Sequence, residues 1–103
     1  MTVEQNLGAT HALSADTRAE LRSLGARYGI RNIRVFGSFA RGEQKPGSDL
    51  DLLVEYMPGQ SGFAFFRFCE EAEQIVGTKV DVATERGLHP KIRNRVIEEA
   101  VPL

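Results

Sequence analysis

The segment Asp49–Tyr56 (DLDLLVEY) limits the fold of this chain more than any other part of the sequence. Leu50, Leu52 and Val54 stand at alternate positions, and this spacing predicts a strand with one buried face. Asp49 and Asp51 share the opposite face, where two carboxylates repel each other unless a cation or solvent lies beside them. Taken alone, the pair also fits the solvated start of a strand, with Asp49 as a turn residue.

Length and charge restrict the class of protein. With 103 residues, the chain is expected to form one compact domain that buries about 60–65% of its unfolded surface. A formal net charge of −1 excludes a protein whose overall charge holds nucleic acid, because such binding needs many Lys and Arg contacts. The single cysteine, Cys69, can form neither an internal disulfide nor a cysteine-rich zinc site, which indicates a reducing compartment. Since the longest apolar run is Phe63–Phe66 and the start of the chain is not leader-like, we expect a cytoplasmic protein that does not span a membrane.

The pattern of apolar residues predicts a single domain of the α/β (α+β) class. Residues 1–13 are polar and aperiodic and are expected to form a flexible N-terminal arm, and residues 14–103 are expected to form the domain. The predicted order of elements is α-β-α-β-α-β-α, with helices packed on a small mixed sheet. The predicted strands are Ile30–Phe36, Asp49–Tyr56 and Thr78–Thr84, and the helical segments are 14–28, Phe39–Glu43, Phe63–Val76 and a last helix from Pro90.

The predicted helix Phe63–Val76 has an unusually apolar sequence. Ser61 fits its N-cap, and Cys69 is expected to be a buried, inert thiol. Aromatic residues wrap more than one face of this helix, which indicates that part of it meets a partner. The residues expected to form its buried stripe are Phe65, Phe66, Cys69, Ala72, Ile75 and Val76.

The Gly37-Ser38 turn follows the first predicted strand directly. If the first two strands are antiparallel neighbours, the end of one lies beside the start of the next. The turn and the two carboxylates of Asp49 and Asp51 would then face one pocket. Glycine permits a close backbone approach, and free amides beside a serine hydroxyl suit an anion. Gly-Ser is also a common turn sequence that binds nothing.

Asp81 supplies a third carboxylate, in the middle of the strand TKVDVAT between two valines that point to the core. The ordinary explanation for an acid at this position is a salt bridge to Lys79 or Arg86. Taken with the Gly37-Ser38 turn and the two earlier aspartates, it suggests another role. Three carboxylates beside an anion-binding turn are the equipment of two-metal phosphoryl or nucleotidyl transfer.

The segment Gly37–Tyr56 (GSFARGEQKPGSDLDLLVEY) resembles the signature of the minimal nucleotidyltransferase family, small relatives of polymerase-β-type palm domains. That signature is Gly-Ser, ten residues, and then Asp-x-Asp, and the spacing here is the same. The resemblance extends from about Leu21 to the end of the sequence. It implies a nucleotidyltransferase palm fold, and Ser48 is expected to cap or orient the loop before the second strand.

Carried over to this sequence, the resemblance implies the following site. Asp49 and Asp51 would hold two Mg²⁺ ions, and Asp81 would complete the catalytic metal site and help to activate the acceptor hydroxyl. Gly37 and Ser38 would bind the outer phosphates of the nucleotide. Arg41 would add charge to that phosphate site, or would be a solvated arginine of the short helix. The incoming hydroxyl would attack the α-phosphorus of a nucleoside triphosphate, most simply ATP, and release pyrophosphate.

The resemblance also implies a partner. Proteins of this kind often act as the antitoxin of a HEPN-domain ribonuclease toxin, and some transfer AMP to a tyrosine of that toxin. The alternative is a non-catalytic binding module that neutralises a partner protein by contact and keeps a vestigial nucleotide site. An aminoglycoside-modifying enzyme is disfavoured, because such enzymes have a second domain for which this chain has no room. We expect that neither a DNA template nor a membrane is a partner. Whether the chain forms an oligomer is left open.

Overall fold

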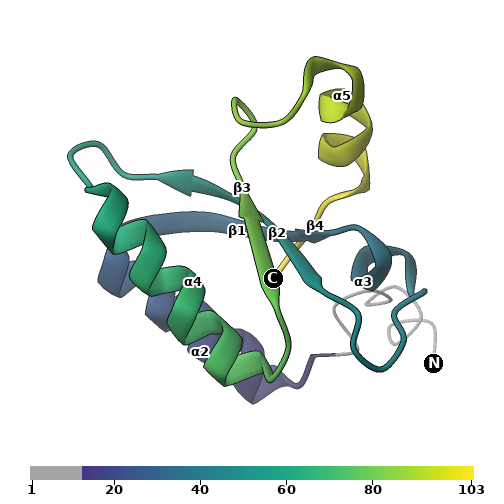
Figure 1. The fold of residues 1–103 in the computed structure, drawn as a ribbon, viewed down its shortest axis with the longest axis horizontal. Coiled ribbons are helices and arrows are strands. Elements are labelled where there is room, and N and C mark those ends of the chain that lie inside the picture. Colours follow the sequence, from purple (N-terminus) through teal and green to yellow (C-terminus); the bar gives the residue numbers. More distant parts are fainter. Residues whose placement is uncertain (1–12) are drawn as a thin grey trace.

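The fold was analysed in a computed structural model that describes residues 13–103. Residues 1–12 of the predicted arm lie outside the described residues, whereas Leu13, which the prediction also placed in the arm, is buried in the core. No helix in the described part of the chain is both long and apolar enough to cross a membrane. The elements, drawn in Figure 1, are α2 (Ala15–Tyr28), β1 (Ile30–Phe36), α3 (Ser38–Arg41), β2 (Leu50–Tyr56), α4 (Gly62–Val76), β3 (Val80–Ala83), α5 (Pro90–Glu99) and β4 (Val101–Pro102).

The four strands form one mixed sheet in the order β3-β2-β1-β4, which confirms the predicted fold class. β1 runs antiparallel to both β2 and β4, whereas β2 and β3 are parallel. β2 begins at Leu50, so Asp49 lies one residue before the strand in which it was predicted. β4 was not predicted, because two residues are too few to show a periodicity.

Helices α2 and α4 lie side by side on one face of the sheet (Figure 1) and cover the main core. Ser14 and Ser61 accept hydrogen bonds from backbone N–H groups in the first turns of these helices, as N-caps do. The core contains the apolar face of β2 that the alternation predicted, together with buried side chains of both helices. Its buried members on β2 and the helices are Leu50, Leu52, Val54, Leu21, Leu24, Phe68 and Ala72.

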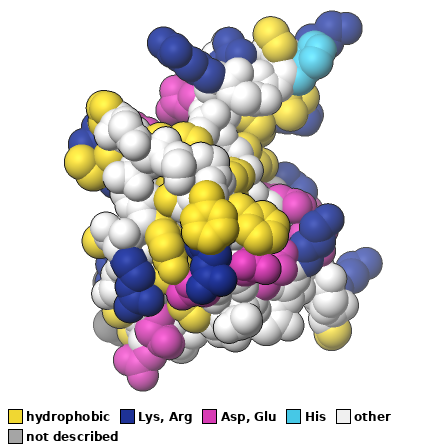
Figure 2. All heavy atoms as spheres, turned by 60° about the vertical axis from the view of Figure 1, so that its left-hand side comes forward, with side chains coloured by type: hydrophobic (Ala, Val, Ile, Leu, Met, Phe, Trp, Pro, Cys, Tyr) yellow, Lys and Arg dark blue, Asp and Glu magenta, His cyan; other side chains and the backbone are white. Residues whose placement is uncertain are grey.

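The prediction of the buried stripe of α4 was wrong at Phe66, whose surface is 56% exposed, and it omitted Phe68, which is fully buried. Phe65, Ile75 and Val76 are partly buried against the core, as expected. Phe63 is 71% exposed. Figure 2 shows hydrophobic side chains gathered on this side of the molecule, between basic and acidic ones. That this part of the helix meets a partner stays a prediction.

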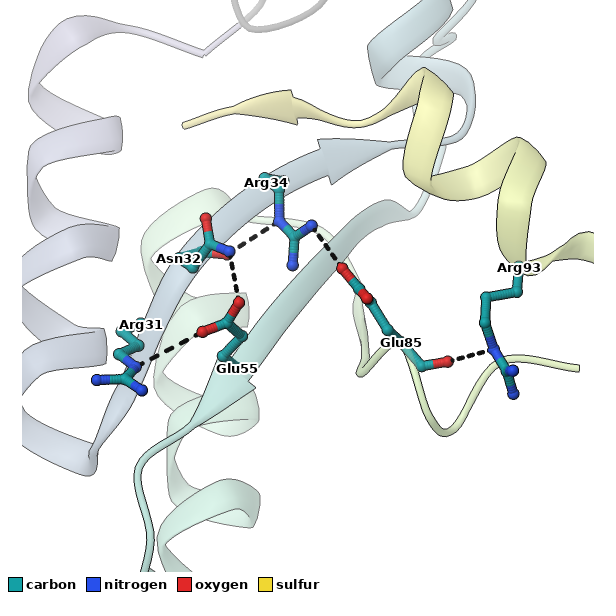
Figure 3. A network of polar contacts seen from close by, with 6 residues as sticks. All are labelled: Arg31, Asn32, Arg34, Glu55, Glu85 and Arg93. Carbon is teal, nitrogen blue, oxygen red and sulfur yellow. Dashed lines mark hydrogen bonds and ion pairs between the residues drawn. The ribbon is translucent and has the colours of Figure 1, made fainter. Parts of the chain in front are cut away.

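The opposite face of the sheet is covered only in part, by α5. Leu53 of β2 packs there against Leu88 and Val96 and is fully buried, so this strand has core residues on both faces. Figure 3 shows how the loop before α5 is attached: Glu85 accepts a hydrogen bond from Arg34 of β1 at 3.0 Å, and its backbone carbonyl accepts one from Arg93 at 2.8 Å. These contacts fix α5 relative to the sheet.

Candidate active site

Asp51 and Asp81 meet at the uncovered end of this second face. The parallel register of β2 and β3 pairs Asp51 directly with Asp81, between the pairs Leu50–Val80 and Leu52–Val82. Because Leu50 and Leu52 point into the main core, alternation puts the two aspartates on the other face of the sheet. Asp49 is exposed immediately before β2. The three predicted carboxylates therefore come from the first residues of β2 and β3 and from the residue just before β2.

Gly37 lies next to this group because β1 and β2 are antiparallel and Phe36 pairs with Asp51. The end of the first strand is thus beside the start of the second, as expected. Gly37 has φ 76° and ψ −150°, which side chains rarely allow, and a Cβ at this position would collide with the carboxylate of Asp51. Only glycine lets the turn approach Asp51 this closely. Ser38 follows it, half-buried, as the first residue of α3.

The surroundings of Asp51 disfavour the ionised form of its carboxylate. Burial raises the pKa of Asp51, and the negative charges of Asp81 and Asp49 raise it further. Lys79 lies 3.7 Å from Asp81, so the salt bridge considered from the sequence is present, but both side chains are at least half exposed. A pair of this kind contributes little. The site therefore holds excess negative charge that a cation would relieve.

The donors suit a hard divalent cation, because Mg²⁺ prefers carboxylate oxygens and water. Among residues 13–103, however, no three His, Cys, Asp or Glu side chains lie close enough together, in their present rotamers, to hold a metal ion. Asp49 and Asp81 are both exposed. The residues fit Mg²⁺ by their chemistry and their placement on the backbone, and the ion would draw their side chains together.

Arg41 is not simply solvated. Its guanidinium contacts Glu43 at 2.9 Å and Glu99 at 2.8 Å, and the hydrogen bonds to these two carboxylates raise its pKa. Glu99, the last residue of α5, also accepts a hydrogen bond from the backbone N–H of Gly37 at 2.6 Å. Sequence reasoning missed Glu99, because nothing in the helix sequence distinguishes it from an ordinary surface charge. Ser48 caps its loop as expected, accepting a hydrogen bond from the N–H of Lys45.

Comparison with known proteins agrees with this geometry. A family model described as "Nucleotidyltransferase domain" matches residues 17–103. The protein adenylyltransferase MntA of Thermococcus cleftensis is 37% identical over 83 residues, which cover 81% of this chain and 84% of that protein. A protein of Methanocaldococcus jannaschii, named as a candidate protein adenylyltransferase, is 41% identical over 75 residues, covering 73% of this chain and 81% of that protein.

Solved structures give the same result. One, described as a candidate minimal nucleotidyltransferase, superposes with a TM-score of 0.77 at 44% identity and covers 85% of this chain and 90% of its own. A chain from a toxin–antitoxin complex with AMP-PNP has the same fold, with a TM-score of 0.69 at 18% identity, and covers 82% of this chain and 70% of its own. The family model spans both the Gly37-Ser38 turn and the three aspartates, and we conclude that this chain is an enzyme of the nucleotidyltransferase domain family and belongs to its minimal nucleotidyltransferases.

Proposed function

We propose that the chain transfers AMP from ATP to a hydroxyl group of a partner protein. The observation that carries this proposal is the contact of the Gly37 turn with Asp51, which is itself the register partner of Asp81. A phosphate-sized anion at the backbone of Gly37 would lie beside both carboxylates. Few arrangements other than phosphoryl or nucleotidyl transfer need an anion site and a cation site in contact.

In this proposal Asp49, Asp51 and Asp81 hold two Mg²⁺ ions, which would supply charge neutralisation and Lewis acidity at the phosphates. Gly37, Ser38 and Arg41 bind the outer phosphates through a backbone N–H, a hydroxyl and a guanidinium. The acceptor oxygen forms a bond to the α-phosphorus, and the bond from the α-phosphorus to the bridging oxygen breaks, so that pyrophosphate leaves. Asp81, the most exposed of the paired acids, receives the proton of the acceptor hydroxyl or passes it to solvent.

The acceptor that we propose is a tyrosine of a HEPN-domain toxin, so that the transfer would make the chain an antitoxin. Two features support a protein acceptor. Relatives at 37% and 41% identity are named as protein adenylyltransferases. Structures of this fold include a complex of MntA with HpeT that is described as a toxin–antitoxin pair.

The test is to incubate the purified chain with ATP, Mg²⁺ and a HEPN-domain toxin as the candidate partner, and to follow the partner by intact-mass spectrometry. We expect the mass to increase by whole AMP units with the wild-type chain and not with Asp49→Asn/Asp51→Asn. Asp16→Asn, which removes an exposed carboxylate from the first turn of α2, is the matched control and should keep the activity.

A partner that gains no AMP from the wild-type chain would refute the proposed transfer. Cell survival distinguishes AMP transfer from the remaining alternative, in which the chain neutralises the toxin by contact alone. In that case the double Asn variant would still protect cells that produce the toxin, although it labels nothing.

A further inference from the structure

We infer that Glu99 is a built-in competitor of the nucleotide: its carboxylate holds Gly37 and Arg41 until the phosphates of ATP displace it. This inference rests on the proposed function, since it concerns the same phosphate-binding groups. It assigns a role to a residue outside the Gly-Ser and Asp-x-Asp motifs, 62 residues after Gly37 in the sequence.

The geometry of Glu99 is that of a bound anion. One carboxylate oxygen accepts the N–H of Gly37 at 2.6 Å, and the other accepts Nη1 of Arg41 at 2.8 Å. Both donors thus bind one two-oxygen anion, as they would bind two oxygens of a phosphate. The side chain of Glu99 is only 20% exposed, whereas that of Arg41 is 48% exposed, so water reaches the contact from the Arg41 side.

The same contacts bring a fourth negative charge to the metal-binding residues. Glu99 is among the groups that raise the pKa of Asp51. A phosphate chain entering at Gly37 would meet Glu99 in the position of its own oxygens, and the single N–H of Gly37 cannot donate fully to both anions. ATP can therefore bind only when the Glu99 contacts break, and the free energy of these contacts lowers its affinity.

The fold lets Glu99 leave without unfolding the helix. Arg93 attaches the first turns of α5 by hydrogen bonds to the carbonyls of Glu85 and Leu88. Glu99 is the last residue of the helix, and the chain is already extended at Ala100. A rotation of the Glu99 side chain, or a small shift of the last turn, is enough to free Gly37 and Arg41.

The experiment measures ATP binding by calorimetry in the presence of Mg²⁺ and without an acceptor. Glu99→Gln removes the charge, and Glu99→Asp keeps the charge but shortens the side chain so that it cannot reach Gly37. We expect both variants to bind ATP about tenfold more tightly than the wild type, equivalent to about 1.4 kcal/mol. The Gly37 amide signal in an NMR spectrum should move when ATP is added to the wild-type chain, and in the ATP-free Glu99→Asp variant it should already differ from its position in the ATP-free wild type, because the bond to Glu99 is lost.

Two control variants remove a neighbouring charge and leave the Glu99 contacts in place. Glu43→Gln takes away the other partner of Arg41, and Glu98→Gln removes the exposed charge next in sequence. Both should bind ATP within about twofold of the wild type, a difference of under about 0.5 kcal/mol.

The outcomes separate this inference from the proposed function. If the wild type binds ATP and neither Glu99 variant binds it more tightly, the competitor role is refuted and the proposed function stands. A gain with Glu99→Gln alone would also refute it, because the effect would then be one of net charge. If neither the wild type nor any variant binds ATP, the proposed function is refuted, and the competitor role with it.

Discussion

Asp51 and Asp81 are register partners on two parallel strands, with their carboxylates on the same face of the sheet. Their surroundings differ: Asp51 is half-buried beside Gly37, whereas Asp81 is exposed and lies near Lys79. Two like charges placed directly opposite each other destabilise a sheet. Their presence therefore costs stability in the free protein, and this cost can be measured.

Replacing Asp51 by Asn is expected to stabilise the free protein at pH 7 and to abolish nucleotidyl transfer. Because the side chain is half exposed, we expect a gain of no more than about 1 kcal/mol in the free energy of unfolding. That gain corresponds to a rise of about 4–8 °C or less in the melting temperature of a domain of this size. Asp51→Asn in an Asp81→Asn background should gain less, since the repulsion has already gone.

The stabilisation expected from Asp51→Asn should depend on pH. The folded-state pKa of Asp51 is raised above its ordinary value of 3.8, so the folded state binds this proton more tightly than the unfolded state. The contribution of Asp51 to stability therefore falls as the pH rises from 3.8 through its raised pKa. The advantage of Asp51→Asn should be full at pH 7 and should vanish below pH 3.8. Melting curves over this range measure it, and a gain that is independent of pH would contradict the assignment.

Mg²⁺ is expected to stabilise the protein even without nucleotide, because it neutralises the three carboxylates of Asp49, Asp51 and Asp81. A ligand at a hundred times its dissociation constant stabilises the folded state by about 2.7 kcal/mol. Thermal unfolding with MgCl₂ and with EDTA measures the effect. The Asp49→Asn/Asp51→Asn variant is the control and should show no shift. An equal shift in both proteins would place the ion elsewhere.

Gly37→Ala is expected to destabilise the protein more than Gly42→Ala and to abolish nucleotidyl transfer. Both glycines have a positive φ, but a Cβ at Gly42 would have nothing within 4 Å, whereas one at Gly37 would collide with Asp51. Gly42→Ala should cost about 1–2 kcal/mol, for the left-handed backbone alone. Gly37→Ala adds the displacement of Asp51 to backbone strain of about 1–3 kcal/mol. Chemical denaturation and AMP transfer are the two measurements, and equal losses in both variants would contradict the close approach.

Local pattern and spacing were sufficient to predict the elements that position the aspartates. The alternation in β2 identified its core face, and the Gly-Ser turn was placed correctly beside the second strand. Two features were not predictable, because each depends on a partner distant in sequence. Leu53 lies on the face of β2 that was not predicted to be buried, and the packing of Leu88 and Val96 covers it. Glu99 acquires its role through Gly37, which is 62 residues away.

The choice between Phe66 and Phe68 in α4 shows the limit of periodicity most clearly. Four phenylalanines within six residues fit more than one helical stripe, and the packing of α4 on the sheet and α2 selects one. Phe68→Ala should cost about 3–5 kcal/mol, the usual loss for a fully buried phenylalanine. Phe66→Ala should change stability by about 0.5 kcal/mol or less, as at other surface positions. Urea unfolding of the two variants measures both free energies of unfolding. A large loss of stability in Phe66→Ala would favour the buried stripe predicted from the sequence, which contains Phe66.

Arg93 is expected to attach α5 to the rest of the domain. Its guanidinium donates to the carbonyls of Glu85 at 2.8 Å and Leu88 at 3.0 Å, both in partly buried surroundings. Arg93→Met keeps most of the apolar side chain but removes the Arg93 donor from both carbonyls and leaves the Glu85 carbonyl only the 3.4 Å bond from the N–H of Leu88, which should cost about 1–3 kcal/mol. Arg95→Met is the matched control, since Arg95 is exposed on the same helix, and it should stay within about 0.5 kcal/mol of the wild type. The shift in the urea midpoint measures the stability change of each variant, provided that the m-value is unchanged. Equal midpoints for the two variants would mean that the packing of Val96 on Leu53 holds α5 without help from Arg93.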